Sequence, residues 1–133
     1  MPAAYTSELA EALAPDLLDR FLRYVRVDTQ SERDRKQSPS TRGQLDLSLM
    51  LKDELTGIGL EDASLDDNGY VMATLPSTTG ASAPVIGLIA HVDVSPDAPG
   101  AGVEPIVHRD YDGSVIELPR DGTVLDPADM AHL

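Results

Sequence analysis

Residues 85–90 (VIGLIA) form an unbroken apolar run between Pro84 and His91, and this run constrains the fold more than any other feature. A short apolar run without polar alternation is typical of a strand buried on both faces, as in the central parallel sheet of an α/β protein. The run is far shorter than the roughly 20 residues that a membrane-spanning helix needs. We therefore expect a buried central strand.

Two helices are expected before this strand. Pro15 lies where a first helical turn tolerates proline, and apolar residues then recur at helical spacing as far as Val25. Residues 1–14 are Ala-rich and are expected to form an extension or a frayed helix. Ser40 or Thr41 can cap a second helix that Gly57 and Gly59 end. Alternating leucines in this segment also fit a strand, but its length of about 16 residues favours a helix.

The remaining segments predict short strands and turns. An Asp-Asn-Gly turn at 67–69 joins strand candidates at 60–65 and 70–75, which predicts a hairpin. After a Pro/Gly-rich loop at 94–102, further short strands are expected at 104–109, 114–118 and 123–125. Two helices, a hairpin and a buried central strand indicate a layered α/β fold, and 133 residues suit one domain.

Composition excludes several classes of function. With 10 basic and 23 acidic side chains the formal net charge is −13, which disfavours binding to nucleic acid or to anionic membrane surfaces. The chain has no cysteine, so histidine, aspartate and glutamate are the strong metal ligands that remain. No secretory signal is evident at the amino terminus, and we expect a cytoplasmic location.

The candidate for chemistry is the pair His91 and Asp93, directly after the apolar run. Residues i and i+2 of an extended chain point the same way, at the strand end where α/β sheets place ligands. Such a pair can act as a metal ligand and the carboxylate that orients it, but a histidine here can equally be a hydrogen-bonded surface residue. Structural roles are expected for His108 and for Asp97, which would shape its loop, and none for His132.

Several segments resemble a known family. They are LLDRFLRYVRVDTQS (17–31), PSTRGQ (39–44), MATLPS (72–77), IGLIAHVDVSPD (86–97), PIVHRDYDGSVIEL (105–118) and DGTVLDPADMAHL (121–133). In order and spacing they are similar to the peptidase T family, the tripeptide aminopeptidases among the M20 metallopeptidases. The resemblance covers residues 15–133, and the H-V-D-x-S-P-D core at 91–97 is its most specific part.

The resemblance implies an α/β catalytic domain that binds two zinc ions and removes the amino-terminal residue from tripeptides. By carry-over, His91 is a ligand of one zinc ion, and the catalytic residue assigned here is Asp93, which orients His91. The mechanism implied is metal-assisted hydrolysis, in which a glutamate acts as general base on a bridging water.

The sequence also departs from the family pattern. The bridging aspartate, the general-base glutamate, the other carboxylate ligands and the second histidine of the family have no matching position in this sequence. We therefore expect residues 15–133 to be the amino-terminal part of an M20-type catalytic domain, truncated, with 1–14 as an extension. At most one zinc ligand, His91, is present, so the isolated chain is expected to be inactive. A homodimer is expected only if the missing dimerisation domain exists.

Two other interpretations stay open. The chain can be a non-catalytic α/β fragment or an interaction module that keeps this part of the fold without the activity. A small-ligand binder of flavodoxin-like shape is disfavoured, because the sequence has no glycine-rich phosphate loop.

Overall fold

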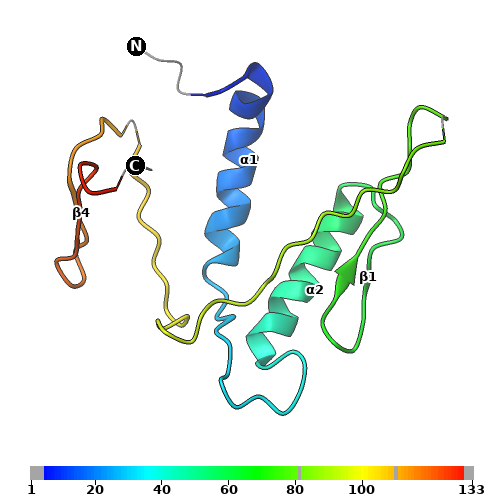
Figure 1. Cartoon of the computed structure of the whole chain (residues 1–133), viewed down its shortest axis with the longest axis horizontal. Coiled ribbons are helices and arrows are strands. Elements are labelled where there is room, and N and C mark those ends of the chain that lie inside the picture. Colours follow the sequence, from blue (N-terminus) through cyan, green and yellow to red (C-terminus); the bar gives the residue numbers. More distant parts are fainter. Residues whose placement is uncertain (1–4, 81, 110, 131–133) are drawn as a thin grey trace.

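The computed structural model describes residues 5–80, 82–109 and 111–130, and Figure 1 shows how its elements are arranged. In chain order the elements are α1 (Glu8–Tyr24), α2 (Arg42–Gly57), β1 (Ser64–Leu65), β2 (Val71–Met72), β3 (Ile116–Glu117) and β4 (Val124–Leu125). The strands form two antiparallel hairpins, β1 with β2 and β3 with β4. The described part is therefore a small α/β structure, which agrees with the predicted class.

Helix α1 begins earlier than the sequence patterns predicted. Its N-cap is Ser7, whose hydroxyl accepts the Ala10 N–H at 3.1 Å, and two glutamates lie in the first turn near the positive end of the helix dipole. The predicted start at Pro15 is wrong, because Pro15 lies inside the helix. A proline there has no N–H to donate to the carbonyl one turn back.

Helix α2 and the first hairpin confirm two predictions. The helix is capped at Thr41, ends at Gly57 and packs against β1 and β2. Gly69 closes the hairpin turn with a φ of 85°, a conformation that glycine adopts without steric cost. The hydroxyl of Ser48 on α2 donates to the Gly69 carbonyl at 3.0 Å, which ties the helix to the turn.

The buried centre of the described residues is small and mostly polar. Leu47 is its one buried large hydrophobic residue, and it is joined by Thr29, Ser40, Gln44 and Ser48. The Gln44 carboxamide accepts the Ser40 N–H at 2.9 Å and donates to the Thr29 carbonyl at 3.3 Å. Among the described residues no buried side-chain nitrogen or oxygen lacks a hydrogen-bond partner, so the burial of these polar groups is compensated.

The predicted central strand at 85–90 is not formed. In Figure 1 this segment is a yellow-green trace with neither helix nor strand. Val85 is 99% exposed, Leu88 95% and Ile89 98%. A buried strand needs partners on both edges and cover on both faces, and the described residues supply neither here. The strand expected at 104–109 is likewise absent from the structure.

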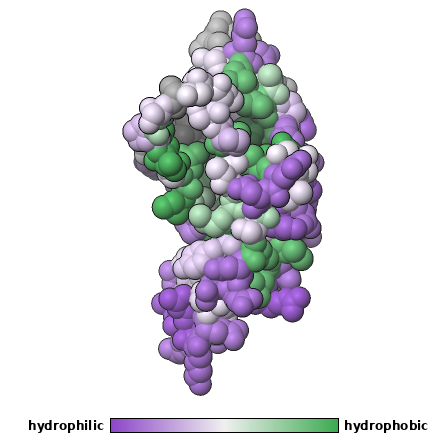
Figure 2. Space-filling model, turned by 90° about the vertical axis from the view of Figure 1, so that its right-hand side faces the viewer, coloured by the Kyte–Doolittle hydropathy of each residue, from purple (hydrophilic) through white to green (hydrophobic). Residues whose placement is uncertain are grey.

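The structure exposes much more surface than a compact chain of its mass. Its accessible area is 10993 Å² for 14.2 kDa, whereas a compact folded monomer of that mass exposes about 6,800 Å². Figure 2 shows hydrophobic side chains at several places on one face. Neither helix described here is long and apolar enough to cross a membrane.

Glu54 on α2 connects the two helices through a cluster of charged and polar groups on α1. Its carboxylate receives a hydrogen bond from Arg20 at 2.6 Å, and it also pairs with Arg23 and with the Tyr24 hydroxyl. Burial opposes the ionisation of Glu54, but the hydrogen bonds from Tyr24 and Arg23 outweigh it and hold its pKa below the ordinary value of 4.5.

This shift predicts how stability depends on pH. A carboxyl whose pKa is lowered by folding stabilises the folded state above its unfolded pKa, and that stabilisation is lost as the pH falls through the folded value. Below pH 4.5 the wild-type chain should therefore lose stability more steeply than Glu54→Gln. Urea unfolding at several pH values measures the difference. Asp53→Asn, at an adjacent exposed carboxylate, is the control; equal slopes for wild type and Glu54→Gln would contradict the expectation.

Candidate functional site

His91 and Asp93 point toward each other, as the sequence pattern predicted. His91 Nδ1 lies 3.0 Å from Asp93 Oδ1, and the two side chains are 85% and 45% exposed. A carboxylate can only accept, so it favours the tautomer with its proton on Nδ1. Nε2 is then the nitrogen with a lone pair for a metal ion.

The carboxylate of Asp93 has a second partner that lies far away in the sequence. The Ser31 hydroxyl donates to Asp93 Oδ2 at 2.5 Å. The hydrogen bond from Ser31, followed by that from His91, lowers the pKa of Asp93 against the opposing effect of burial. Asp93 is therefore an ionised acceptor fixed on both oxygens.

The backbone holds Ser31 beside Asp93. The Ser31 N–H donates to the Val94 carbonyl at 3.0 Å, and the Val94 N–H donates to the Thr29 carbonyl at 3.2 Å. These bonds make a parallel bridge between Gln30 and Val94. The loop after α1 is thus paired with the residue that directly follows Asp93.

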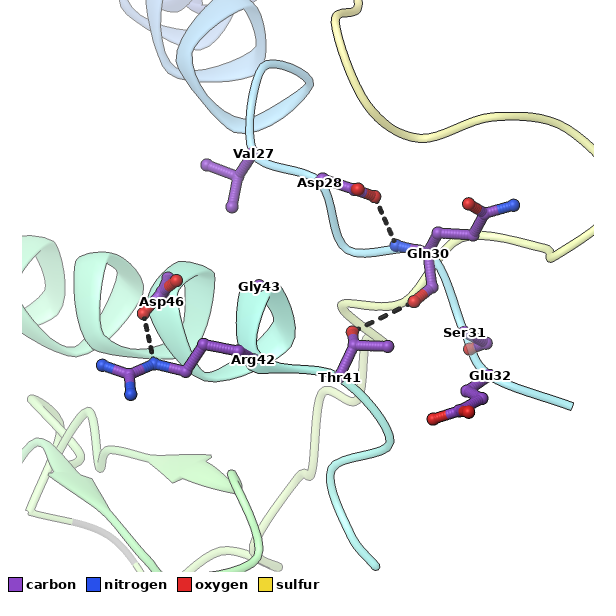
Figure 3. A pocket seen from close by; sticks show the side chains of 9 residues that line it. All are labelled: Val27, Asp28, Gln30, Ser31, Glu32, Thr41, Arg42, Gly43 and Asp46. Carbon is purple, nitrogen blue, oxygen red and sulfur yellow. Dashed lines mark hydrogen bonds and ion pairs between the residues drawn. The ribbon is translucent and has the colours of Figure 1, made fainter. Parts of the chain in front are cut away.

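The same loop is fixed from its other side to the start of α2 (Figure 3). The Thr41 hydroxyl donates to the Gln30 carbonyl at 3.0 Å. Gly43, in the first turn, approaches the loop so closely that a Cβ there would lie 1.7 Å from the Asp28 carbonyl oxygen. The loop position therefore requires glycine at 43.

An open cavity of about 690 Å³ lies beside the pair, bounded by α2, the first hairpin and residues 88–93. Both site residues and Ser31 line it. Its apolar lining includes Leu51, Leu55, Met72, Leu88 and Ile89. The His91–Asp93 pair thus lies at the edge of a space with an apolar wall.

Among the described residues, His91 is the candidate ligand for a metal ion, and it would supply one ligand. Within 5–80, 82–109 and 111–130, no group of three or more His, Asp or Glu gathers as a metal site. His91 with Asp93 is nevertheless the usual arrangement of a ligating histidine and its orienting carboxylate. The remaining ligands of a catalytic zinc, which normally takes three from protein, would have to come from elsewhere.

Of the other residues singled out by the sequence, the two that the structure describes, Asp97 and His108, form no hydrogen bond or ion pair with this pair. Asp97 accepts from the Ser95 hydroxyl at 2.7 Å and pairs with Arg33, so it joins the 94–102 loop to the loop after α1. His108 is exposed. His132 lies outside the described residues.

Ser31 is the site residue that sequence reasoning missed. It lies 62 positions before Asp93, and a polar loop gives no local signal for a pairing at that distance. The only sequence signal for Ser31 was that it ends the 17–31 segment, which resembles the family.

The sequence of this chain is similar to Peptidase T from several bacteria. No family model matches it. It is 48% identical over 119 residues to Peptidase T of Geobacillus kaustophilus, 47% over 119 to Peptidase T of Listeria monocytogenes and 44% over 122 to Peptidase T of Bacillus cereus strain Q1. These alignments cover 89–91% of this chain but only 29–30% of each relative. Over about nine-tenths of its length, the chain is thus homologous to peptidase T, of which it spans less than a third.

Proposed function

We propose that this chain is the amino-terminal part of a zinc-dependent aminopeptidase of the M20 family that removes the amino-terminal residue from tripeptides in the cytoplasm. The homology to Peptidase T supports a peptidase. The observation that carries the site assignment is the hydrogen bond between His91 Nδ1 and Asp93 Oδ1. It presents Nε2 to a metal ion and increases the basicity of the ring.

In this proposal each residue of the pair has one task. His91 binds one zinc ion through Nε2, and Asp93 fixes the ring orientation and tautomer. A zinc ion held there would supply Lewis-acid chemistry, which polarises a scissile carbonyl and makes water more acidic. The second zinc ion and any homodimer contact depend on protein outside this chain.

We further propose that the 133-residue chain alone does not hydrolyse tripeptides. Asp93, whose two oxygens are hydrogen-bonded to Ser31 and His91, is assigned here to orienting His91, and the general-base glutamate of the family has no matching position in this sequence. One histidine also cannot hold a dinuclear site.

The purified chain, incubated with zinc and a tripeptide, is therefore expected to release no free amino acid above the no-protein blank. Geobacillus kaustophilus Peptidase T under the same conditions serves as the positive control. Turnover by this chain that disappears in His91→Ala would overturn the inactivity proposal.

The second candidate is a non-catalytic α/β fragment or interaction module, and the exposure of 85–90 favours it, because such apolar surface is typical of interaction sites. Sequencing the coding DNA beyond codon 133 separates the two. An open frame that supplies further Asp, Glu and His ligands supports the peptidase, and an immediate stop supports the fragment.

A further inference from the structure

We propose that Ser31 is a positioning residue, whose hydroxyl holds the Asp93 carboxylate in the orientation that sets the tautomer of His91. The geometry is a relay of two hydrogen bonds, from Ser31 Oγ to Asp93 Oδ2 at 2.5 Å and between Asp93 Oδ1 and His91 Nδ1 at 3.0 Å. The importance of Ser31 for catalysis rests on the proposed function, whereas its effect on the His91 tautomer does not depend on that function.

Ser31 restrains a carboxylate that little else restrains. The Asp93 side chain is 45% exposed, and the terminal torsion of an aspartate is broad. With Oδ2 bonded to Ser31, rotation about that torsion would break a hydrogen bond, so Oδ1 stays directed at His91. Without the hydroxyl, water competes for both oxygens and the ring loses its fixed acceptor.

The hydroxyl is itself well fixed. The Ser31 N–H binds the Val94 carbonyl, and the preceding residue, Gln30, is bonded to Thr41 at the start of α2. Ser31 and Asp93 are therefore held by backbone pairing that does not involve their side chains. A substitution at Ser31 can remove the hydroxyl while this pairing stays.

The chain offers matched variants for a test. Ser31→Thr keeps a hydroxyl, whereas Ser31→Val has nearly the same shape without one. Ser95 is a control serine nearby, because its hydroxyl bonds Asp97 rather than Asp93. The tautomer of His91 is read in the full 133-residue chain from the ¹⁵N shifts of its ring nitrogens, at one pH where the ring is neutral.

In wild type we expect the Nδ1–H form to dominate. In Ser31→Val and Ser31→Ala the ratio of Nδ1–H to Nε2–H should fall about fivefold, the factor that one ordinary hydrogen bond is worth. Ser31→Thr and Ser95→Ala should keep the wild-type ratio. Backbone shifts of Thr29 and Val94 check that the bridge persists. An unchanged ratio in Ser31→Val, or equal ratios in Ser31→Val and Ser31→Thr, overturns the proposal.

A second measurement separates this inference from the proposed function. In a chimera that carries this chain in place of the matched segment of Geobacillus kaustophilus Peptidase T, Ser31→Val should lower activity about 10–100-fold, as is typical when a partner of a metal ligand is lost. A tautomer shift with a chimera inactive in every form supports the role of Ser31 and counts against the proposed function. An active chimera with an unmoved tautomer overturns the role of Ser31 alone.

Discussion

Replacing His91 by alanine is expected to lower kcat/KM for a tripeptide by on the order of 10³-fold or more, equivalent to about 4 kcal/mol of transition-state stabilisation. The reason is that the substitution removes the one metal ligand that this chain is proposed to supply, and within the described residues no group of three or more His, Asp or Glu gathers that could hold the ion without it. The measurement uses the chimera in which this chain replaces the matched segment of Geobacillus kaustophilus Peptidase T. Bound zinc, measured by metal analysis, should fall in parallel.

His108→Ala is the matched control for this experiment. His108 is an exposed histidine outside the site, so its removal should leave both activity and zinc content unchanged. Retention of activity in His91→Ala, or an equal loss in His108→Ala, would contradict the assignment of His91 as a ligand.

The exposed apolar segment predicts a second large effect, on self-association. Residues 85–90 present Val85, Leu88 and Ile89 to solvent on an unpaired backbone, which is a template for pairing with another chain. The isolated chain should therefore associate with increasing concentration. Ile89→Lys should weaken this association about 10–100-fold, the range expected when burial of one large apolar side chain is lost.

Sedimentation velocity over a range of concentrations measures this association. Ile58→Lys is the control, because it places the same charge at another exposed isoleucine, directly after α2. A wild-type chain that stays monomeric throughout, or an equal effect of the two lysine variants, would show that residues 85–90 do not mediate association.

The features that the sequence predicted correctly depend on nearby residues. Helix α2 follows from its cap position and glycine stop, and the first hairpin follows from the turn that ends in Gly69. The pairing of His91 with Asp93 needs only an extended backbone between them. In each case the determining contacts lie within a few residues, where sequence spacing maps directly onto geometry.

The features that were missed depend on distant partners or on an overlooked cap. An apolar run becomes a buried strand only when other segments pair with it, and the described residues do not cover 85–90. Ser31 reaches Asp93 through a bridge between loops, which has no periodicity to detect. The earlier start of α1 depends on Ser7, a cap residue obscured by the Ala-rich composition around it.

The absence of a side chain at Gly43 allows the first turn of α2 to lie directly against the loop after α1. The Asp28 carbonyl occupies the place that a Cβ would take, so the two segments are in direct backbone contact here. The Thr41 hydroxyl makes a second contact between these segments, because it donates a hydrogen bond to the Gln30 carbonyl. The start of α2 and the loop that leads to Ser31 therefore meet at two points, and a side chain added at position 43 is expected to displace this loop and, with it, Ser31.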